Sequence, residues 1–251
     1  MTEHIDFNCD LGEGCGDDAA IVPCISSASI ACGGHAGSEQ SMREAVELCR
    51  AHGVAVGAHP SFVDREHFGR RELSMSPAAI HVLVTAQTRR LLAVCEQASV
   101  RLRHVKPHGA LYNRAARDRD VADAVVAAVH ALDPQLFVYA LAGSELVHAA
   151  RARGLQVAEE VFAERGYTAQ GRLVPRGQPG DVIESVNAAM AQVRTMLRDG
   201  QVEAVGGGRV PIHADTLCLH GDRDDAAAFA RALHETLRAE GFNIAAPGDH
   251  A

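Results

Sequence analysis

The sequence contains no tryptophan, and only 4% of its 251 residues are aromatic. No apolar run approaches the roughly 20 residues that cross a membrane. Acidic residues outnumber basic ones by 32 to 24, and the resulting net charge of −8 argues against general binding to nucleic acid or anionic membranes. The acidic first 20 residues are unlike a signal peptide. We therefore expect a cytoplasmic protein with no nucleic-acid or membrane partner.

Several well-known catalytic motifs are also missing. The seven cysteines form no Cys-x-x-Cys pair, so reduced and buried thiols are the expected state. The sequence has no phosphate-loop motif, no Gly-x-Ser-x-Gly elbow and no His-Glu-x-x-His pair, and the glycines at 12–16 lack dinucleotide-fold spacing. A phosphate group would have to be bound by Lys106, Arg70, Arg71 or Arg176 together with backbone N–H groups of glycine loops, although Arg71 is more simply a solvated surface residue.

Seven short apolar runs are predicted to be β-strands, and each is followed by polar or charged residues. They cover residues 5–9, 28–32, 54–58, 102–105, 136–141, 157–162 and 216–219. Helical patterns fill most of the gaps between them, which predicts parallel βαβ units. The length suits one barrel. We therefore predict an α/β protein, a seven-stranded parallel β/α barrel forming a single domain over 1–251, with a hairpin-like insertion at about 201–214.

Reactive side chains concentrate at the predicted C-terminal ends of the strands, where barrels of this kind carry their active sites. The densest stretch is 104–113, HVKPHGALYN, in which Pro107 cannot continue a strand. Five of the fourteen histidines follow or end strands, namely His35, His59, His104, His108 and His220. Together with Asp10, Glu13 and Asp222 they indicate an active site.

A metal at this site is left open by the sequence. Asp10, His59 and His108 can supply the three nitrogen and oxygen ligands of a hydrolytic zinc site. These ligands would come from separate strands, and nothing in their spacing identifies an ion. Two long irregular segments, 62–76 and 164–181, are predicted to be functional loops.

In its longer motifs the sequence resembles the LamB/YcsF (lactam-utilisation) family from about residue 5 to residue 242. The motifs that carry the resemblance are NxDLGEG at 8–14, SAxIACGxHAG at 27–37, GAHPSF at 57–62, FGR at 68–70, HVKPHGxLYN at 104–113, LAGS at 141–144, EVFA at 160–163, LVPR at 173–176 and CxHGD at 218–222. They occur in order and with family-like spacing. Glu164 departs from the family by replacing the usual aspartate, which leaves its role open.

The resemblance implies an irregular seven-stranded barrel related to the glycoside hydrolase and carbohydrate deacetylase barrels. It also implies the A component of an ATP-dependent 5-oxoprolinase, which converts 5-oxo-L-proline, ATP and water into L-glutamate, ADP and phosphate together with two partner subunits, B and C. ATP is then a cosubstrate, and a divalent metal of unknown identity is compatible with the residues. Two alternatives are a metal-dependent amide or carbohydrate deacetylase-type hydrolase, and a non-catalytic scaffold within the oxoprolinase complex.

The implied reaction needs cations for phosphate, a group that activates water, and donors for a developing oxyanion. We assign catalysis to Asp10, Lys106, His108 and Asp222. We assign binding of substrate or phosphate to Glu13, His35, His59, Arg70, His104, Tyr112, Asn113, Arg176 and His220.

Overall fold

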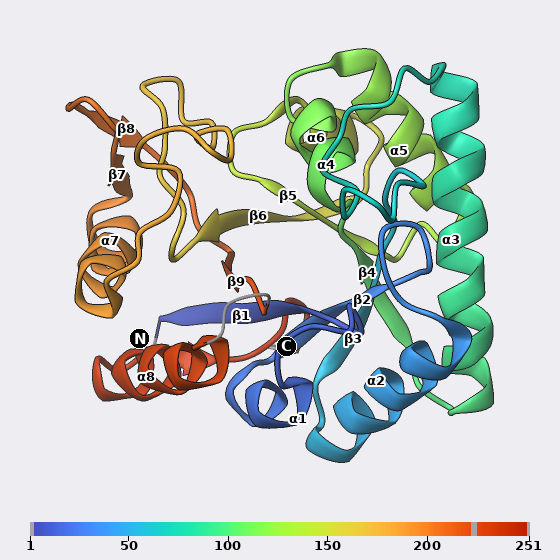
Figure 1. The fold of residues 1–251 in the computed structure, drawn as a ribbon, viewed down its shortest axis with the longest axis horizontal. Helices are drawn as coiled ribbons and strands as arrows, with labels where there is room; N and C mark the ends of the chain where they lie inside the picture. The colour runs from blue at the N-terminus through green and yellow to red at the C-terminus, as the bar shows by residue number, and fades with distance from the viewer. Residues whose placement is uncertain (1–2, 222–224, 250–251) are drawn as a thin grey trace.

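A computed structural model describes residues 3–221 and 225–249 of the chain. Seven parallel strands form a closed barrel, in which the last strand pairs with both β6 and β1 (Figure 1). The strands are β1 (His4–Leu11), β2 (Ser27–Ala31), β3 (Ala55–His59), β4 (Leu102–Val105), β5 (Phe137–Leu141), β6 (Gln156–Phe162) and β9 (Thr216–Leu219). All seven predicted strands are present, so the predicted barrel is confirmed.

Helices surround the barrel and connect successive strands. They are α2 (Glu39–His52), α3 (Pro77–Gln97), α5 (Arg119–Leu132), α6 (Glu145–Ala152), α7 (Val186–Asp199) and α8 (Ala226–Ala239). Their ends follow local chemistry. The Ser76 hydroxyl accepts a hydrogen bond from the first turn of α3, Pro77 occupies its first position, and Gly53 ends α2 in the left-handed conformation.

Four short elements were not predicted from the sequence. Helix α4 (Gly109–Ala115) begins directly after His108, in a stretch expected to be a loop. With seven residues it is too short to show helical periodicity in the sequence, and its first residue, Gly109, is a poor helix former. Strand β10 (Asn243–Ile244) adds two residues to the start of β1, and α1 (Asp18–Ile21) continues into the 3₁₀ turn η1 (Val22–Cys24).

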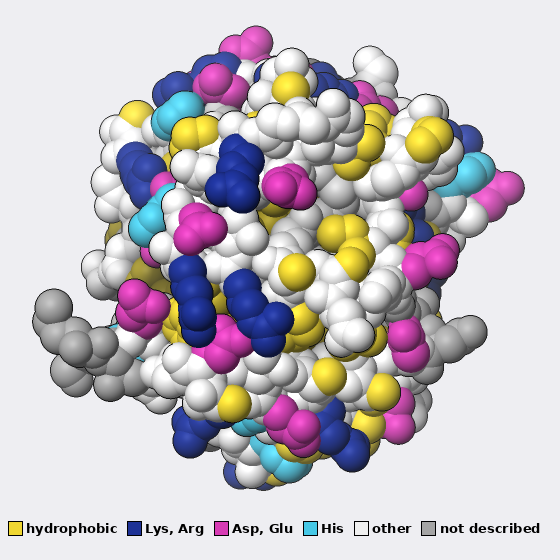
Figure 2. All heavy atoms as spheres, turned by 90° about the vertical axis from the view of Figure 1, so that its left-hand side faces the viewer, with side chains coloured by type: hydrophobic (Ala, Val, Ile, Leu, Met, Phe, Trp, Pro, Cys, Tyr) yellow, Lys and Arg dark blue, Asp and Glu magenta, His cyan; other side chains and the backbone are white. Residues whose placement is uncertain are grey.

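The segment before the last barrel strand contains a small antiparallel hairpin, β7 (Gln201–Glu203) with β8 (Arg209–Pro211). It lies with α7 on the side of the barrel away from α3 (Figure 1). That side carries interleaved basic and acidic side chains (Figure 2). Arg194 and Arg198 of α7 both pair with Glu240 after α8, which ties these helices together. Within the described residues, no helix has the length and apolar character needed to cross a membrane.

The inner face of the barrel is polar at several levels. Side chains two residues apart on a strand point to the same face, so Asp6, Asn8 and Asp10 of β1 all point into the barrel. Their contacts cross it: Asp6 and Asn8 both bond to Thr216 on β9, and Asp10 pairs with Lys106 beyond β4. The alternate residues of β1 belong to the apolar core beneath the helices.

Candidate functional site

A cavity of about 600 Å³ opens at the C-terminal ends of the strands. Nine of the residues predicted for the site line it: Asp10, His59, Arg70, Lys106, His108, Tyr112, Asn113, Arg176 and His220. The carboxylate, ammonium and imidazole groups at its floor are buried, whereas the arginines at its rim are exposed. The C-terminal ends of parallel strands lie at the same end of a barrel. Residues that are far apart in the sequence therefore come together there.

Lys106 lies at the floor of the cavity with only 2% of its surface exposed. The backbone N–H groups of Lys106 and His108 donate to carbonyls of Ala58 and Pro60, so the ladder between β3 and the chain after β4 continues to this point. The Lys106 ammonium lies 2.7 Å from Asp10 Oδ1 and donates to Glu160 Oε1 at 2.9 Å. It is therefore an ion-paired buried lysine, not a solvated side chain at a loop edge.

The charges of Asp10 and Lys106 stabilise each other. Burial alone would raise the pKa of Asp10, but nearby His59 and Lys106 outweigh it and hold the pKa well below its usual value. Burial alone would lower the pKa of Lys106, but the carboxylates of Asp10 and Glu160 hold it well above its usual value. Both groups are thus charged at neutral pH.

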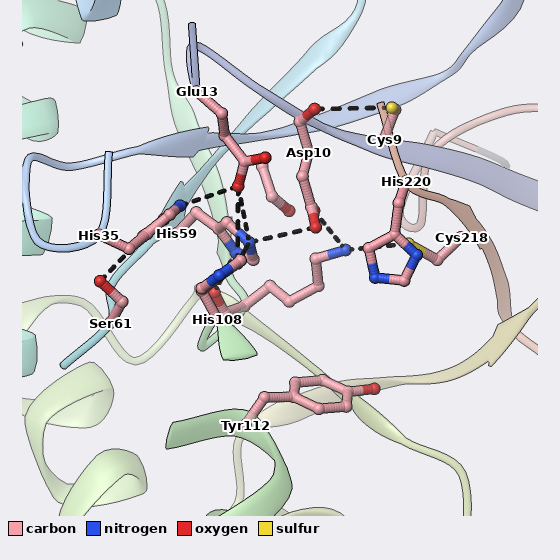
Figure 3. Close-up of polar contacts among 12 residues, drawn as sticks. Cys9, Asp10, Glu13, His35, His59, Ser61, His108, Tyr112, Cys218 and His220 are labelled. Atoms are coloured by element: carbon pink, nitrogen blue, oxygen red, sulfur yellow. Dashed lines mark hydrogen bonds and ion pairs between the residues drawn. The ribbon is translucent and has the colours of Figure 1, made fainter. Parts of the chain in front are cut away.

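His59 and His108 face each other beside Asp10 and Glu13 (Figure 3). The outer nitrogen of each ring is bonded to a backbone carbonyl: His59 Nδ1 to Lys106 at 2.7 Å and His108 Nε2 to Phe68 at 2.9 Å. A carbonyl oxygen can only accept, so both outer nitrogens carry a hydrogen. The two inner nitrogens, His59 Nε2 and His108 Nδ1, lie 2.9 Å apart.

Glu13 and His35 do not line the cavity but lie directly behind these histidines. Glu13 Oε1 is 2.8 Å from His35 Nε2, 3.5 Å from His108 Nδ1 and 4.0 Å from His59 Nε2. The His35 ring stacks on that of His108, with centroids 3.7 Å apart. Burial lowers the pKa of His35 to about 3, with a smaller contribution from His59, so its ring is neutral at pH 7.

His104 was assigned to substrate or phosphate binding, and its position does not support that role. Its side chain lies one level below Lys106 inside the barrel, 1% exposed, and is absent from the cavity lining. It bonds to Ser29 Oγ at 3.1 Å and stacks on Tyr139 with ring centroids 3.9 Å apart. The barrel interior buries it because it lies on β4, two residues before Lys106 and on the same side of the chain.

His220 lies at the edge of the cavity with its ring stacked on Phe162. Its Nδ1 is in close contact with the Glu164 carboxylate, which is itself buried and does not line the cavity. Glu164 is therefore in a position to orient the His220 ring. Asp222, the remaining predicted catalytic residue, lies outside the described residues.

Sequence reasoning did not assign Glu160 to the site. It is fully buried on β6 and accepts hydrogen bonds from the Lys106 ammonium, from Tyr112 Oη at 2.6 Å and from Asn8 Nδ2 at 3.0 Å. The available signal was a glutamate within an otherwise apolar strand. Arg165 and Arg172 in the second long loop also line the cavity and were not predicted.

Two groups of side chains within the described residues have the spacing of metal ligands. One comprises Glu13, His35, His59 and His108, and the other comprises Asp10, Cys218 and His220. Burial raises the pKa of the Cys218 thiol well above its usual value. A thiol held in its protonated form is a poor nucleophile, so imidazoles and carboxylates carry the chemistry that this site can perform.

Comparison with known proteins places this geometry in a family. A model described as the LamB/YcsF family matches residues 5–250. The lactam utilization protein from Thermus thermophilus is 44% identical, with a TM-score of 0.91, and the match covers 97% of this chain and 99% of that one.

Structures with much lower sequence identity were also found. A GH113 β-1,4-mannanase is 11% identical with a TM-score of 0.50, and the match covers 95% of this chain and 98% of that one, which shows the barrel fold alone. The peptidoglycan deacetylase PdaC from Bacillus subtilis is 14% identical with a TM-score of 0.47, covering 97% and 87%. With the family model matched over nearly its whole length, the chain belongs to the LamB/YcsF family.

Proposed function

We propose that this chain is the A component of an ATP-dependent 5-oxoprolinase and that its strand-end cavity holds the lactam during ring opening. The observation that carries the proposal is the buried Lys106 ion-paired with Asp10 and Glu160 at the floor of a cavity with an arginine-rich rim. It is supported by the membership of a family whose Thermus thermophilus relative is described as a lactam utilization protein.

The distribution of charge suits two different ligands. The floor offers one ammonium, which can donate to an oxygen of a small cyclic amide. Arg70, Arg172 and Arg176 at the rim offer planar cations of the kind that bind phosphate oxygens in pairs. ATP therefore lies toward the rim in this proposal, with its γ-phosphate directed at the lactam oxygen on the floor.

The reaction balances with two molecules of water. The lactam oxygen attacks the γ-phosphorus, the bond to ADP breaks, and the ring carbon becomes bonded to a good leaving group. Water adds to this carbon, the ring C–N bond breaks as nitrogen takes a proton, and an acyl phosphate remains. A second water releases phosphate and leaves L-glutamate. Phosphorylation overcomes the resonance that gives the amide C–N bond its partial double-bond character.

The chain's own residues have distinct tasks in this scheme. Lys106 stays protonated and neutralises negative charge on the oxygens of the phosphoryl group during its transfer. Asp10 stays ionised at the floor of the cavity, so its carboxylate can take a proton from the attacking water. Tyr112 is held protonated because burial and then Glu160 raise its pKa well above its usual value, and it positions Glu160.

The test is reconstitution with and without partners. The purified chain alone should not convert 5-oxo-L-proline, because the cavity lacks a phosphate loop and needs the B and C subunits to retain ATP. With both partners added, glutamate, ADP and phosphate should form in equal amounts. Ring opening by the chain alone without ATP would contradict the proposal.

A second candidate is favoured by a separate observation. The histidine and carboxylate cluster formed by Glu13, His59 and His108 resembles the donor set of metal-dependent hydrolases. In that case the chain would hydrolyse an amide or acetylated sugar without ATP. Assaying the chain alone, supplied with divalent metals, on acetylated amino sugars and on 5-oxo-L-proline separates the two functions.

A further inference from the structure

The inner nitrogens of His59 and His108 lie within hydrogen-bond distance of each other, but in the neutral rings neither of them carries a hydrogen to donate. Each ring uses its only hydrogen, in the neutral form, on a backbone carbonyl, at Lys106 and Phe68 respectively. Their inner nitrogens, 2.9 Å apart, would then point two lone pairs at each other. A cation between the rings would relieve this contact.

The carboxylate of Glu13 lies against both rings. Its side chain is 5% exposed, and its Oε1 is 3.5 Å from His108 Nδ1 and 4.0 Å from His59 Nε2. A carboxylate oxygen and two ring nitrogens that carry no hydrogen are all acceptors, and a cation between them would bind all three.

We propose that Glu13 Oε1, His59 Nε2 and His108 Nδ1 bind a divalent first-row metal ion. Zinc is the ion that this ligand set suits best. The three atoms are 2.9, 3.5 and 4.0 Å apart. Tetrahedral bonds of about 2.0–2.2 Å place ligand atoms roughly 3.4 Å apart, so small side-chain movements close the site. Two imidazoles and one carboxylate, with a position left open, suit zinc and neighbouring first-row ions.

Two neighbouring residues are outside the ligand set. Asp10, a ligand candidate from the sequence, has its Oδ1 engaged 2.7 Å from the Lys106 ammonium, so Glu13 replaces it in the proposed set. The His35 ring is parallel to that of His108 within 5°, so one ion cannot lie in both ring planes. His35 instead donates from Nε2 to Glu13 and fixes the carboxylate, as outer partners of metal ligands commonly do.

The test measures metal binding, not turnover, and so stands apart from the proposed ATP-dependent reaction. The full chain, stripped with a chelator, is titrated with Zn²⁺ by calorimetry and with Co²⁺ by absorption spectroscopy, which reports the ligand geometry. Wild type should bind one equivalent. Glu13→Gln and His108→Gln should lose that site, and His35→Asn should weaken it by about 10–100-fold.

The matched control is His220→Gln, which alters a cavity histidine that belongs to the other cluster and should keep the one-equivalent site. Thermal melting of each metal-free variant checks its fold. Should Glu13→Gln or His108→Gln not fold, the wild-type stoichiometry and the His35→Asn affinity decide. Wild type that binds no zinc, affinity unchanged in folded Glu13→Gln, or loss of the site in folded His220→Gln would overturn the proposal.

Discussion

Asp6 and Asp10 lie on the same face of the same strand, four residues apart. Their surroundings in the barrel shift the pKa values of the two carboxyl groups in opposite directions. Asp6 accepts hydrogen bonds from the hydroxyls of Ser26, Ser27 and Thr216 at 2.6–2.7 Å. Burial raises its pKa, and these neutral donors only partly oppose that rise. Asp10 faces Lys106 and His59, and its pKa is held well below the usual value.

The same contrast holds for the layers to which the two carboxylates belong. In the deeper layer, His104 stacks on Tyr139, and polar groups are paired largely with neutral partners. In the upper layer, at the strand ends, an ammonium, carboxylates and imidazoles meet at a cavity. Buried polar groups therefore pair with neutral partners in the deeper layer, whereas the upper layer keeps charged groups at the cavity in which we propose that substrate binds. The predictions below test that division.

The largest expected effect follows removal of the Lys106 charge. Lys106→Met leaves Asp10 and Glu160 buried without a cation, so the free energy of unfolding should fall by about 3–5 kcal/mol. Chemical denaturation measures this loss. Adding Asp10→Asn and Glu160→Gln to the same chain should recover much of it, since no charge is then left unpaired. A single variant as stable as wild type would show that the upper layer does not depend on this charge.

Gly57 tests the packing of the deeper layer. A Cβ added at Gly57 would lie 2.1 Å from the His104 ring, so Gly57→Ala should lower the free energy of unfolding by about 1–3 kcal/mol through overpacking. The matched control repeats the substitution in a His104→Ala background, where the methyl group has room. An equal loss in both backgrounds would rule out the ring as the cause.

The pH dependence of stability tests the neutrality of His104. Burial, and then Lys106, hold its pKa well below its usual value in the folded chain. Below about pH 6.5, the ordinary pKa of histidine, the unfolded chain therefore binds a proton that the folded chain does not, and stability falls as pH falls. In the metal-free protein, His104→Gln should reduce that slope by up to about 1.4 kcal/mol per pH unit. Denaturation curves between about pH 6.5 and 4.5 measure it, and parallel slopes would mean that His104 is not held neutral.

The smallest effect on stability is expected at the rim. Arg176 is exposed beside the cavity, so Arg176→Ala should change stability by no more than about 0.5 kcal/mol. In the reconstituted complex it should raise KM for ATP several-fold, because a phosphate contact is lost. Arg153→Ala removes an equal charge from an exposed position outside the cavity lining and should leave KM unchanged. Equal KM values in both variants would remove Arg176 from ATP binding.

The sequence was sufficient to predict the barrel and the meeting of Asp10, His59, Lys106 and His108 at one end of it. Apolar runs ending in polar residues carry that information, since parallel strands in a closed barrel end at the same edge. The sequence did not show how deep inside the barrel each side chain lies. His104 and Lys106 are only two residues apart in the sequence. His104 lies deeper in the barrel because of the register of β4 against β3 and because Gly57 leaves room for its ring.

Glu160 was missed for a related reason. A glutamate inside an apolar strand could face either the helices or the barrel interior, and only the partners contributed by other strands, Lys106 and Asn8, explain its burial. Such partnerships join residues far apart in the chain. Local sequence patterns do not contain them.

The most direct measurement applies one substitution to both layers. Asp10→Asn and Asp6→Asn each remove one carboxylate charge from β1, and each variant is assayed for phosphate and glutamate formation in the reconstituted complex, per folded molecule. Asp10→Asn should lower turnover by about a hundredfold or more, because it removes the ionised partner of His59 and Lys106. Asp6→Asn should keep turnover near wild type while lowering the melting temperature. Near-normal turnover in Asp10→Asn, or equal loss in both, would contradict the account.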